Sequence, residues 1–321
     1  MPFNSWKQAP HEAYIVGLKE LPENDSSPLE HVHIFFAHCY KHQAGWKDIL
    51  SRFAVGKGTL LDLEFLTDEK GRRVAAFGYH AGFAGTAVGL ETWCHQRLTP
   101  PGARIGPQPG IKPYPNEDEL ISYLKQRLSL AMERSGGAYP RIMVMGALGR
   151  CGTGACDFAR RVGVPEENII KWDMKETQRG GPFPEILDCD IFVNCIYLSS
   201  PIPPFMTTQM LTDTSADKRA LTVIVDVSCD TTNPHNPIPI YNQNTTFDHP
   251  VLTLNQGGAL AEKPVDVVAI DHLPTLLPRE ASESFCQALL PSLQELKDRQ
   301  HARVWTDAEK LFRSKLAEAE L

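Results

Sequence analysis

The chain has 321 residues, of which 42% are hydrophobic and 22% are charged, and its formal net charge is −7 at pH 7. This length and composition predict about two globular domains with substantial cores, and the mild acidity without a long basic run argues against a nucleic-acid partner. No apolar run approaches the roughly 18 residues of a membrane span, and the N-terminus lacks the apolar core of a signal peptide, so we expect a cytoplasmic protein without a membrane partner.

Two predicted strands near the N-terminus each end in ionisable residues. Residues 14–20 (YIVGLKE) are an apolar run that ends at Lys19 and Glu20, and residues 31–37 (HVHIFFA) are another that delivers His38. Charge at the carboxyl end of a strand is where α/β proteins place their chemistry. Residue type alone favours a solvated lysine at position 19 and a core or surface histidine at position 38.

The next segments predict a helix, two strands and a second helix. The spacing of apolar residues indicates a helix over 43–53 that ends at the following glycines, and the alternation over 60–66 (LLDLEFL) indicates a strand with Asp62 and Glu64 on one face. A short strand is expected over 73–77. Residues 78–98, rich in small side chains and free of proline, predict a helix crossing between domains, whose glycines allow close packing on a sheet.

A loop rich in proline and glycine covers 99–115, and Asn116 with Glu119 is an N-cap signature for a helix reaching Arg134. Residues 142–145 (IMVM) then indicate a strand buried on both faces, followed by a helix over 150–162. Between them begins a series with the spacing G-x-x-G-x-x-G-x-G, which comprises Gly146, Gly149, Gly152 and Gly154.

Backbone amides in such a turn, at the start of a helix, can hold a pyrophosphate. A second apolar run, 169–172, ends at Asp173, where an acid would bind a ribose hydroxyl and favour NAD over NADP. The positive charges of the nearby Lys171 and Lys175 weaken that preference for NAD. Because the glycine spacing departs from G-x-G-x-x-G, a merely structural turn is the alternative to a dinucleotide site.

Further strands are expected over 190–195, 221–227 and 265–270, with a polar, proline-rich loop after the second of them. Two C-terminal helices, beginning at Pro278 and at Thr306, have no sheet of their own and are expected to pack back on the first domain or the hinge.

The eight cysteines are scattered, without C-x-x-C pairs or metal-ligand spacing. We therefore expect reduced thiols and no metal site. Cys151 and Cys195 follow neighbouring strands and could form a redox-sensitive pair, although two separate thiols are favoured in a reducing compartment.

Long blocks of the chain resemble the fungal saccharopine dehydrogenases of the NAD-dependent, lysine-forming type. The resemblance is carried by LKE, FAHCYK, LEFL, GRRVAAFG, GALGRCG, KWDMKET, NCIY, DVSCDTTNPHNPIPIY and IDHLPTLLPREAS. It implies an α/β architecture of two doubly wound, Rossmann-like parallel-sheet domains with a cleft between them. Residues 1–78 and 276–321 would form the substrate domain, and residues 79–275 the NAD-binding domain.

The family also carries an N-terminal strand-helix-strand segment, with a substrate-binding arginine, that this sequence does not contain. We therefore expect an N-terminally shortened first domain. One alternative function is a shortened chain that binds NAD with little or no turnover, and another is a related amino-acid or imine dehydrogenase on the same scaffold.

The resemblance implies oxidation of saccharopine by NAD⁺ and water to lysine and 2-oxoglutarate. By motif match, Lys19 would deprotonate the secondary amine and His38 would activate water. Glu20 and Glu64 would balance charge in a site that also holds Lys41. On residue type alone, Glu64 is equally a solvated strand residue.

Arg73 and Phe77 would contact the substrate, because a ligand with several carboxylates requires guanidinium groups. The NAD contacts implied by the resemblance are Arg72, Gly149, Arg150, Asp173, Thr177, Tyr197, Val227, Ile270, Asp271, His272 and Leu273. Taken alone, Arg150 could be a solvated helix residue.

The sequence ends in Ala319, Glu320 and Leu321, which does not resemble a peroxisomal signal and agrees with the cytoplasmic assignment. No residue pattern requires an oligomer, and a monomer is compatible with the sequence.

Overall fold

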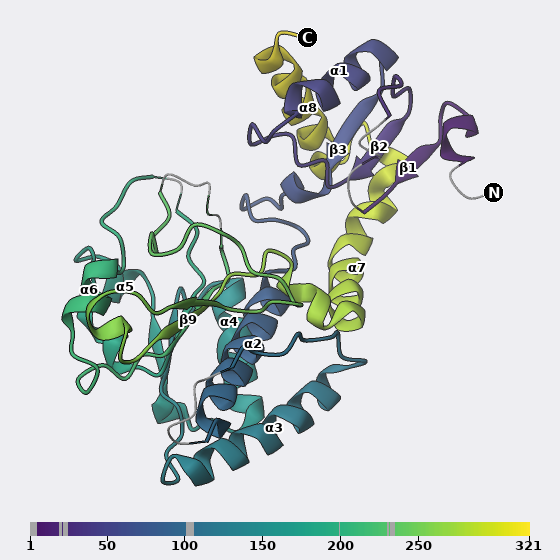
Figure 1. Ribbon diagram of the computed structural model, residues 1–321. Coiled ribbons are helices and arrows are strands. Elements are labelled where there is room, and N and C mark those ends of the chain that lie inside the picture. The colour runs from purple at the N-terminus through teal and green to yellow at the C-terminus, as the bar shows by residue number, and fades with distance from the viewer. Residues whose placement is uncertain are drawn as a thin grey trace. The chain divides into compact units, whose positions relative to one another are not determined.

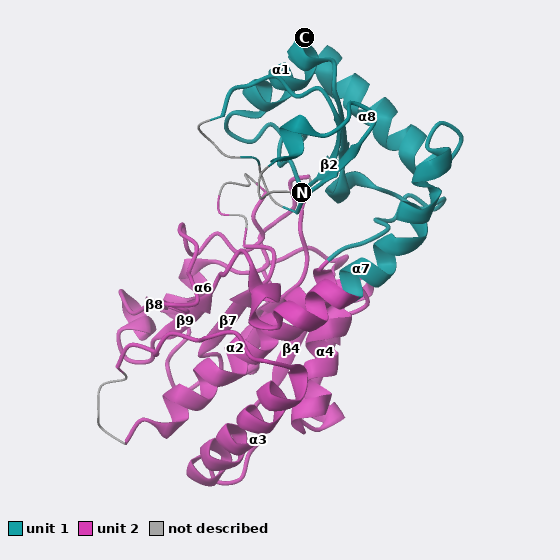
Figure 2. Ribbon diagram, turned by 90° about the vertical axis from the view of Figure 1, so that its right-hand side faces the viewer, with its two compact units in different colours: residues 1–76, 284–321 teal, residues 77–283 magenta. Residues whose placement is uncertain are grey.

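A computed structural model describes residues 5–18, 21, 25–100, 106–198, 200–229, 231 and 235–321. The chain divides into two compact units (Figure 2). Unit 1 comprises Met1–Ala76 and Ser284–Leu321, and unit 2 comprises Phe77–Glu283. Among the described residues, no helix is long and apolar enough to cross a membrane.

Unit 1 is built on a small parallel sheet, whose described strands are β1 (Tyr14–Val16), β2 (Val32–Phe35) and β3 (Thr59–Asp62), in that order. Helices α1 (Trp46–Gly56) and α8 (Arg303–Ala319) pack with it (Figure 1). The rings of Phe53 on α1 and Phe312 on α8 meet edge to face, with centroids 5.7 Å apart. The C-terminal helix therefore completes the core of the first unit.

Unit 2 contains a larger sheet with the strand order β5-β4-β6-β7-β9-β8 among the described residues. Its strands run parallel except for β8, which pairs antiparallel with β9. Their bounds are β4 Ile142–Met145, β5 Ile169–Trp172, β6 Ile191–Asn194, β7 Val223–Asp226, β8 Leu252–Leu254 and β9 Val265–Val268. Strands β5 and β6 flank β4 on opposite sides, so the winding direction reverses at β4, where α/β sheets open a ligand-binding crevice.

Both faces of this sheet are covered. One face packs against α2 (Gly78–Leu98), α3 (Glu117–Arg134) and α4 (Arg150–Val162). The other packs against residues 183–187, α6 (Thr208–Asp213) and the segment 238–241. The strands are therefore mostly apolar, as expected for a parallel sheet buried on both sides, and their polar residues include Lys171 on β5 and Asp266 on β9. The remaining described helices are α5 (Met174–Thr177) and α7 (Pro278–Gln294).

Glycine permits the close approach of α2 to α4. A Cβ at Gly82 would lie 1.8 Å from the carbonyl oxygen of Cys151, closer than any side chain tolerates. The prediction of a tightly packed glycine-rich helix over 78–98 is confirmed, as is the helix over 150–162. Helix α2 lies wholly within unit 2, however, so the expectation that it crosses between domains is wrong.

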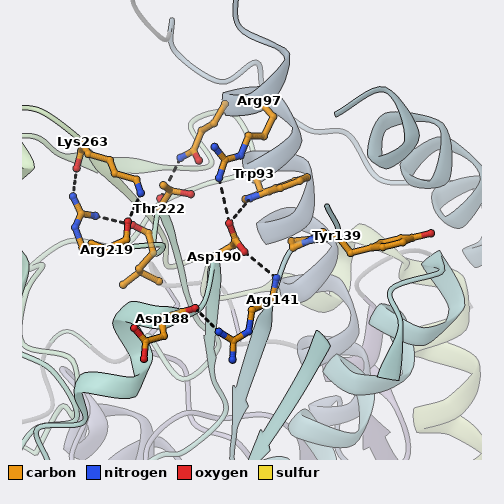
Figure 3. A network of polar contacts seen from close by, with 12 residues as sticks. Trp93, Arg97, Tyr139, Arg141, Asp188, Asp190, Arg219, Thr222 and Lys263 are labelled. Atoms are coloured by element: carbon orange, nitrogen blue, oxygen red, sulfur yellow. Dashed lines mark hydrogen bonds and ion pairs between the residues drawn. The ribbon is translucent and has the colours of Figure 1, made fainter. Parts of the chain in front are cut away.

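A polar network lies at the amino-terminal edge of the unit 2 sheet (Figure 3). The carboxylate of Asp190, which precedes β6, accepts hydrogen bonds from Trp93 Nε1 at 3.4 Å, Arg97 Nη2 at 3.2 Å and the backbone amide of Arg141 at 2.9 Å. This single carboxylate therefore ties α2 to the segments that enter β4 and β6.

Two cationic side chains clasp the segments that precede β7 and β9. The guanidinium of Arg219 donates to the carbonyl oxygen of Lys263, and the ammonium of Lys263 donates to the carbonyl oxygen of Arg219 (Figure 3). Arg219 is 1% exposed, and it also donates to the carbonyl of Leu221 at 2.7 Å. Burial lowers the pKa of Lys263, and the charges of Arg219 and Arg97 lower it further.

Two local strand predictions are wrong. The strand expected over 60–66 ends at Asp62, because the Asp62 carboxylate accepts the backbone amide of Glu64 at 2.9 Å and turns the chain into the 3-10 helix Leu63–Phe65. Residues 73–77 form no strand beyond an isolated bridge between Thr67 and Arg73. The helix expected over 43–53 does form, as α1, which begins at Trp46 and ends at Gly56.

The predicted α/β fold with parallel sheets is confirmed, and both C-terminal helices form as expected, with α8 returning to unit 1. Strand β8 was not anticipated, since its three residues (LTL) are too short to show a periodic pattern.

Candidate active site

The glycine turn after β4 has the geometry of a phosphate-binding turn. Gly146 has a φ of 84°, which favours glycine, and its amide donates to the carbonyl of Trp172 at 2.8 Å. A Cβ at Gly152 would lie 2.1 Å from the carbonyl oxygen of Gly146, so the turn and the helix meet without room for a side chain. Gly149, the N-cap of α4, supplies no side-chain cap, so the helix N-terminus can receive an external anion.

Asp173 lies directly beside this turn. It is the N-cap of α5 and forms a capping box with Glu176. One carboxylate oxygen accepts the backbone amide of Met174 and the other accepts the amide of Leu148, each at 2.9 Å. The acid that follows β5 is thus fixed against the loop that follows β4, although 25 residues separate Leu148 from Asp173.

The other residues expected around a dinucleotide differ in exposure. The Thr177 hydroxyl donates to the Asp173 carbonyl at 3.0 Å, and Arg150 is exposed on the first residue of α4. Tyr197, after β6, is 56% exposed, and Val227, after β7, is half-buried.

The segment after β9 combines two buried and two exposed side chains. Ile270 and Leu273 belong to the apolar core, so only their backbones are available to a ligand. Asp271 and His272 are exposed, and the His272 ring packs edge to face on Phe247 with centroids 5.6 Å apart.

Cys151 and Cys195 are not joined in a disulfide in the structure. Burial raises the pKa of Cys195 well above its ordinary value, and the nearby Cys151 raises it further. This environment favours the protonated form of the Cys195 thiol.

In unit 1, the described candidate residues gather at the carboxyl ends of β2 and β3. Glu64, whose side chain is 13% exposed, accepts from Lys41 Nζ at 2.7 Å and from Arg73 Nη2 at 2.8 Å. Burial alone would raise the pKa of Glu64, but the hydrogen bond and charge of Lys41, together with Arg73 and His38, lower it overall. The structure therefore brings two cations onto one ionised carboxylate.

His38 has a left-handed backbone with a φ of 51°, which is uncommon outside glycine. The residue before it is held by Asp62, whose carboxylate accepts the backbone amide of Ala37 at 3.2 Å. The residue that precedes His38 is therefore tied to the end of the neighbouring strand β3.

Asp62 itself is 1% exposed. Burial raises its pKa to about 6 and the charge of Glu64 acts in the same direction, while the amides of Glu64 and Ala37 and the charge of His38 oppose the shift.

Some candidates stand apart from these clusters. Lys19 and Glu20 lie outside the described residues. The guanidinium of Arg72 pairs with Asp68 at 3.0 Å in an exposed turn. Arg73 belongs to unit 1, whereas Phe77 is the N-cap of α2 and belongs to unit 2.

Comparison with known proteins shows the family to which the chain belongs. Residues 2–84 match the family model described as alanine dehydrogenase/PNT, N-terminal domain. The chain is 58% identical over 312 residues to saccharopine dehydrogenase (NAD(+), L-lysine-forming) of Schizosaccharomyces pombe, covering 97% of this chain and 82% of that protein. It is 59% identical to the enzyme of the same name from Yarrowia lipolytica, covering 96% and 80% of the two chains. The chain belongs to this saccharopine dehydrogenase family.

A solved L-alanine dehydrogenase shares the fold of this saccharopine dehydrogenase family member. The superposition has a TM-score of 0.56 at 11% sequence identity and covers 94% of this chain and 75% of the other. At this identity the likeness establishes the architecture alone.

Two buried aspartates in this family member had not been assigned a role from the sequence. Asp62 ends β3 and Asp226 ends β7, and each is 1% exposed and accepts backbone amides. The available signal was an acid within an apolar run, Asp62 beside Glu64 in 60–66 and Asp226 near the end of 221–227. Nothing in either segment indicates which amides the acid will reach.

Proposed function

We propose that this chain is an NAD-dependent, lysine-forming saccharopine dehydrogenase. The reaction converts saccharopine, NAD⁺ and water to lysine, 2-oxoglutarate, NADH and a proton. The observation that carries the proposal is 58% identity to the Schizosaccharomyces pombe enzyme across 97% of this chain. At such identity over both units, the residues of one site are expected to act in the same reaction.

NAD fits the carboxyl edge of the unit 2 sheet. The glycine turn, at the start of a 13-residue helix that no side chain caps, suits a pyrophosphate held by Gly149 and Arg150. Asp173 and Thr177 take the adenosine side, where a carboxylate repels a 2′-phosphate and so favours NAD over NADP.

The nicotinamide side is assigned to the residues that follow β6, β7 and β9, namely Tyr197, Val227, Ile270, Asp271, His272 and Leu273. Arg72 was placed nearer the cofactor by the family resemblance, but its pairing with Asp68 makes a charge-balanced turn an equally good explanation. When bound, NAD⁺ accepts the hydride from the carbon that bears the secondary amine.

The residues of unit 1 supply the proton transfers. Hydride removal requires a neutral amine, and Lys19 is assigned as the base that deprotonates it, on the basis of the LKE motif. A free lysine has a pKa of about 10.4, so this role requires nearby cations or burial to lower it. His38 then activates the water that hydrolyses the imine, and passes the proton onward.

Glu64 and Glu20 balance the cations of this site. The pairing of Glu64 with Lys41 and Arg73 supports this role for Glu64, because its ionised carboxylate offsets part of their charge. The remaining positive charge suits a substrate with several carboxylates, with Arg73 as the guanidinium contact and Phe77 as an apolar contact. We further propose that the protein is cytoplasmic and acts without a nucleic-acid or membrane partner; a monomer is sufficient for this assignment.

The test measures NADH formation by the purified chain with NAD⁺ and saccharopine, and identifies lysine and 2-oxoglutarate as products. His38→Asn should abolish turnover while leaving NAD binding unchanged. His42→Asn is the matched control, because His42 is 55% exposed and pairs with Glu318.

Absence of lysine formation, with NAD binding retained, would contradict the proposed reaction. A panel of other secondary-amine and amino-acid substrates would then show whether a related dehydrogenase activity is present instead.

A further inference from the structure

A buried carboxylate organises the carboxyl edge of β6 and β7. Asp226 is 1% exposed, and its two oxygens accept five hydrogen bonds. The donors are Asn194 Nδ2 at 2.9 Å, the Ser228 amide at 3.2 Å and hydroxyl at 2.8 Å, the Cys229 amide at 3.2 Å, and the Tyr241 hydroxyl at 2.7 Å. A carboxylate, which has only acceptors, matches a site where every neighbour donates.

The same network joins the segments that follow β6 and β7. Asn194 Nδ2 also donates to the carbonyl of Ile196 at 3.1 Å, and Asn194 Oδ1 accepts the Ile196 amide at 3.1 Å. The Ser228 hydroxyl oxygen, whose single proton goes to Asp226, lies 3.1 Å from the same Ile196 carbonyl oxygen and 3.0 Å from Asn194 Nδ2, which donates to it. Both the amide and the carbonyl of the Ile196 backbone are therefore hydrogen-bonded to this network.

Ile196 in turn touches the glycine turn. A Cβ at Gly146 would lie 2.8 Å from Ile196 Cγ1 and 3.3 Å from the carbonyl of Cys195. The glycine turn thus packs against the segment after β6. A displacement of Ile196 would therefore displace Gly146 as well.

We propose that Asp226 is a positioning residue for dinucleotide binding, which through Asn194 and Ser228 holds Ile196 against the phosphate turn. The Tyr241 hydroxyl, which follows the proline-rich loop, donates to the second oxygen of Asp226 and so joins this part of the chain to the same carboxylate. The inference rests on the proposed function for the identity of the dinucleotide. It goes beyond that function because Asp226 need not touch the dinucleotide itself.

Two substitutions test this role. Asp226→Asn presents an amide donor to a ring of donors, and Tyr241→Phe removes one hydrogen bond while keeping the ring in the apolar core. The dissociation constant of NAD⁺ is measured by calorimetry without saccharopine, followed by kcat and both KM values. We expect Asp226→Asn to weaken NAD⁺ binding about tenfold or more and Tyr241→Phe to weaken it less, with the KM for saccharopine little changed.

Asp190→Asn is the matched control, since Asp190 accepts three hydrogen bonds at the opposite edge of the same sheet (Figure 3). It should lower the melting temperature and leave the NAD⁺ dissociation constant within twofold. Equal effects of Asp226→Asn and Asp190→Asn on NAD⁺ binding, or unchanged binding in Asp226→Asn, would overturn the positioning role.

The two proposals fail differently. A parent chain that binds NAD⁺ but releases no lysine would refute the proposed reaction. The NAD⁺ dissociation constants of Asp226→Asn and Asp190→Asn would still decide whether Asp226 is a positioning residue. A parent chain that does not bind NAD⁺ would refute the positioning role as well.

Discussion

Replacing Asp62 by asparagine should change how the stability of unit 1 depends on pH. Burial raises the pKa of Asp62 from 3.8 to about 6, so the folded state binds this proton more tightly than the unfolded state does. The stabilising contribution is therefore complete below about pH 4 and is lost as pH rises through about 6. At about 1.36 kcal/mol per pKa unit, the whole effect is about 3 kcal/mol, of which roughly 1 kcal/mol falls between pH 5 and pH 7.

The asparagine side chain of the D62N variant has no proton to lose, so this component disappears. Relative to the parent, the variant should gain roughly 1 kcal/mol between pH 5 and pH 7, on top of a constant loss from the backbone acceptor that asparagine cannot provide to both Ala37 and Glu64. Urea unfolding followed by hydrogen exchange of β2 and β3 isolates unit 1, and comparison at equal pH cancels the intrinsic exchange rates.

Asp48→Asn, an exposed change in the first turn of α1, is the control and should show a pH-independent difference from the parent. The reasoning would be refuted if D62N and the parent lost stability in parallel over this pH range. That result would mean that the folded environment of Asp62 does not favour its protonated form.

Three further outcomes are expected. Gly82→Ala places a methyl group 1.8 Å from the Cys151 carbonyl oxygen and should lower the free energy of unfolding of unit 2 by about 3 kcal/mol, measured by thermal unfolding. Gly106→Ala, with no atom within 4 Å of the new Cβ, is the control and should change that free energy by less than about 0.5 kcal/mol. Similar melting temperatures for the two variants would contradict the packing argument. Asp173→Asn removes the charge that repels a 2′-phosphate and should raise the ratio of kcat/KM for NADP to that for NAD about tenfold, so an unchanged ratio would exclude Asp173 from cofactor selection. Glu64→Gln should destabilise unit 1 at neutral pH and progressively less as pH falls, because a carboxylate with a lowered pKa stabilises the fold only when it is ionised. A loss of unfolding free energy that persists at pH 3 would instead point to lost packing.

The sequence predicts best where the signal is local. Helices α2 and α4 begin and end at the expected residues, and β4 matches its apolar run, because periodicity and glycine spacing are properties of neighbouring residues. The glycine turn after β4 was recognisable as a turn for the same reason, and Gly152 is required by a contact with Gly146, only six residues away. The contact of Gly146 with Ile196 spans 50 residues, and the glycine spacing does not indicate it.

Prediction fails where a side chain redirects the chain. The alternation of residues 60–66 continues past Asp62, but the Asp62 carboxylate binds the Glu64 amide and converts the expected strand into a turn. The positions of the buried acids show the same limit. Tyr241 lies 15 residues from Asp226 and Ala37 lies 25 residues from Asp62, and no pattern in the sequence pairs them.

The clasp between Arg219 and Lys263 has a consequence for how the two positions can vary among homologues. Each side chain binds the main-chain carbonyl of the other residue, and that carbonyl is present whatever side chain stands there. A substitution at Arg219 therefore removes the guanidinium donor but leaves the main-chain carbonyl of residue 219, to which Lys263 donates, and the converse holds for a substitution at Lys263. Despite their contact, the two positions should vary almost independently, so residue covariation would miss this contact between residues 44 positions apart.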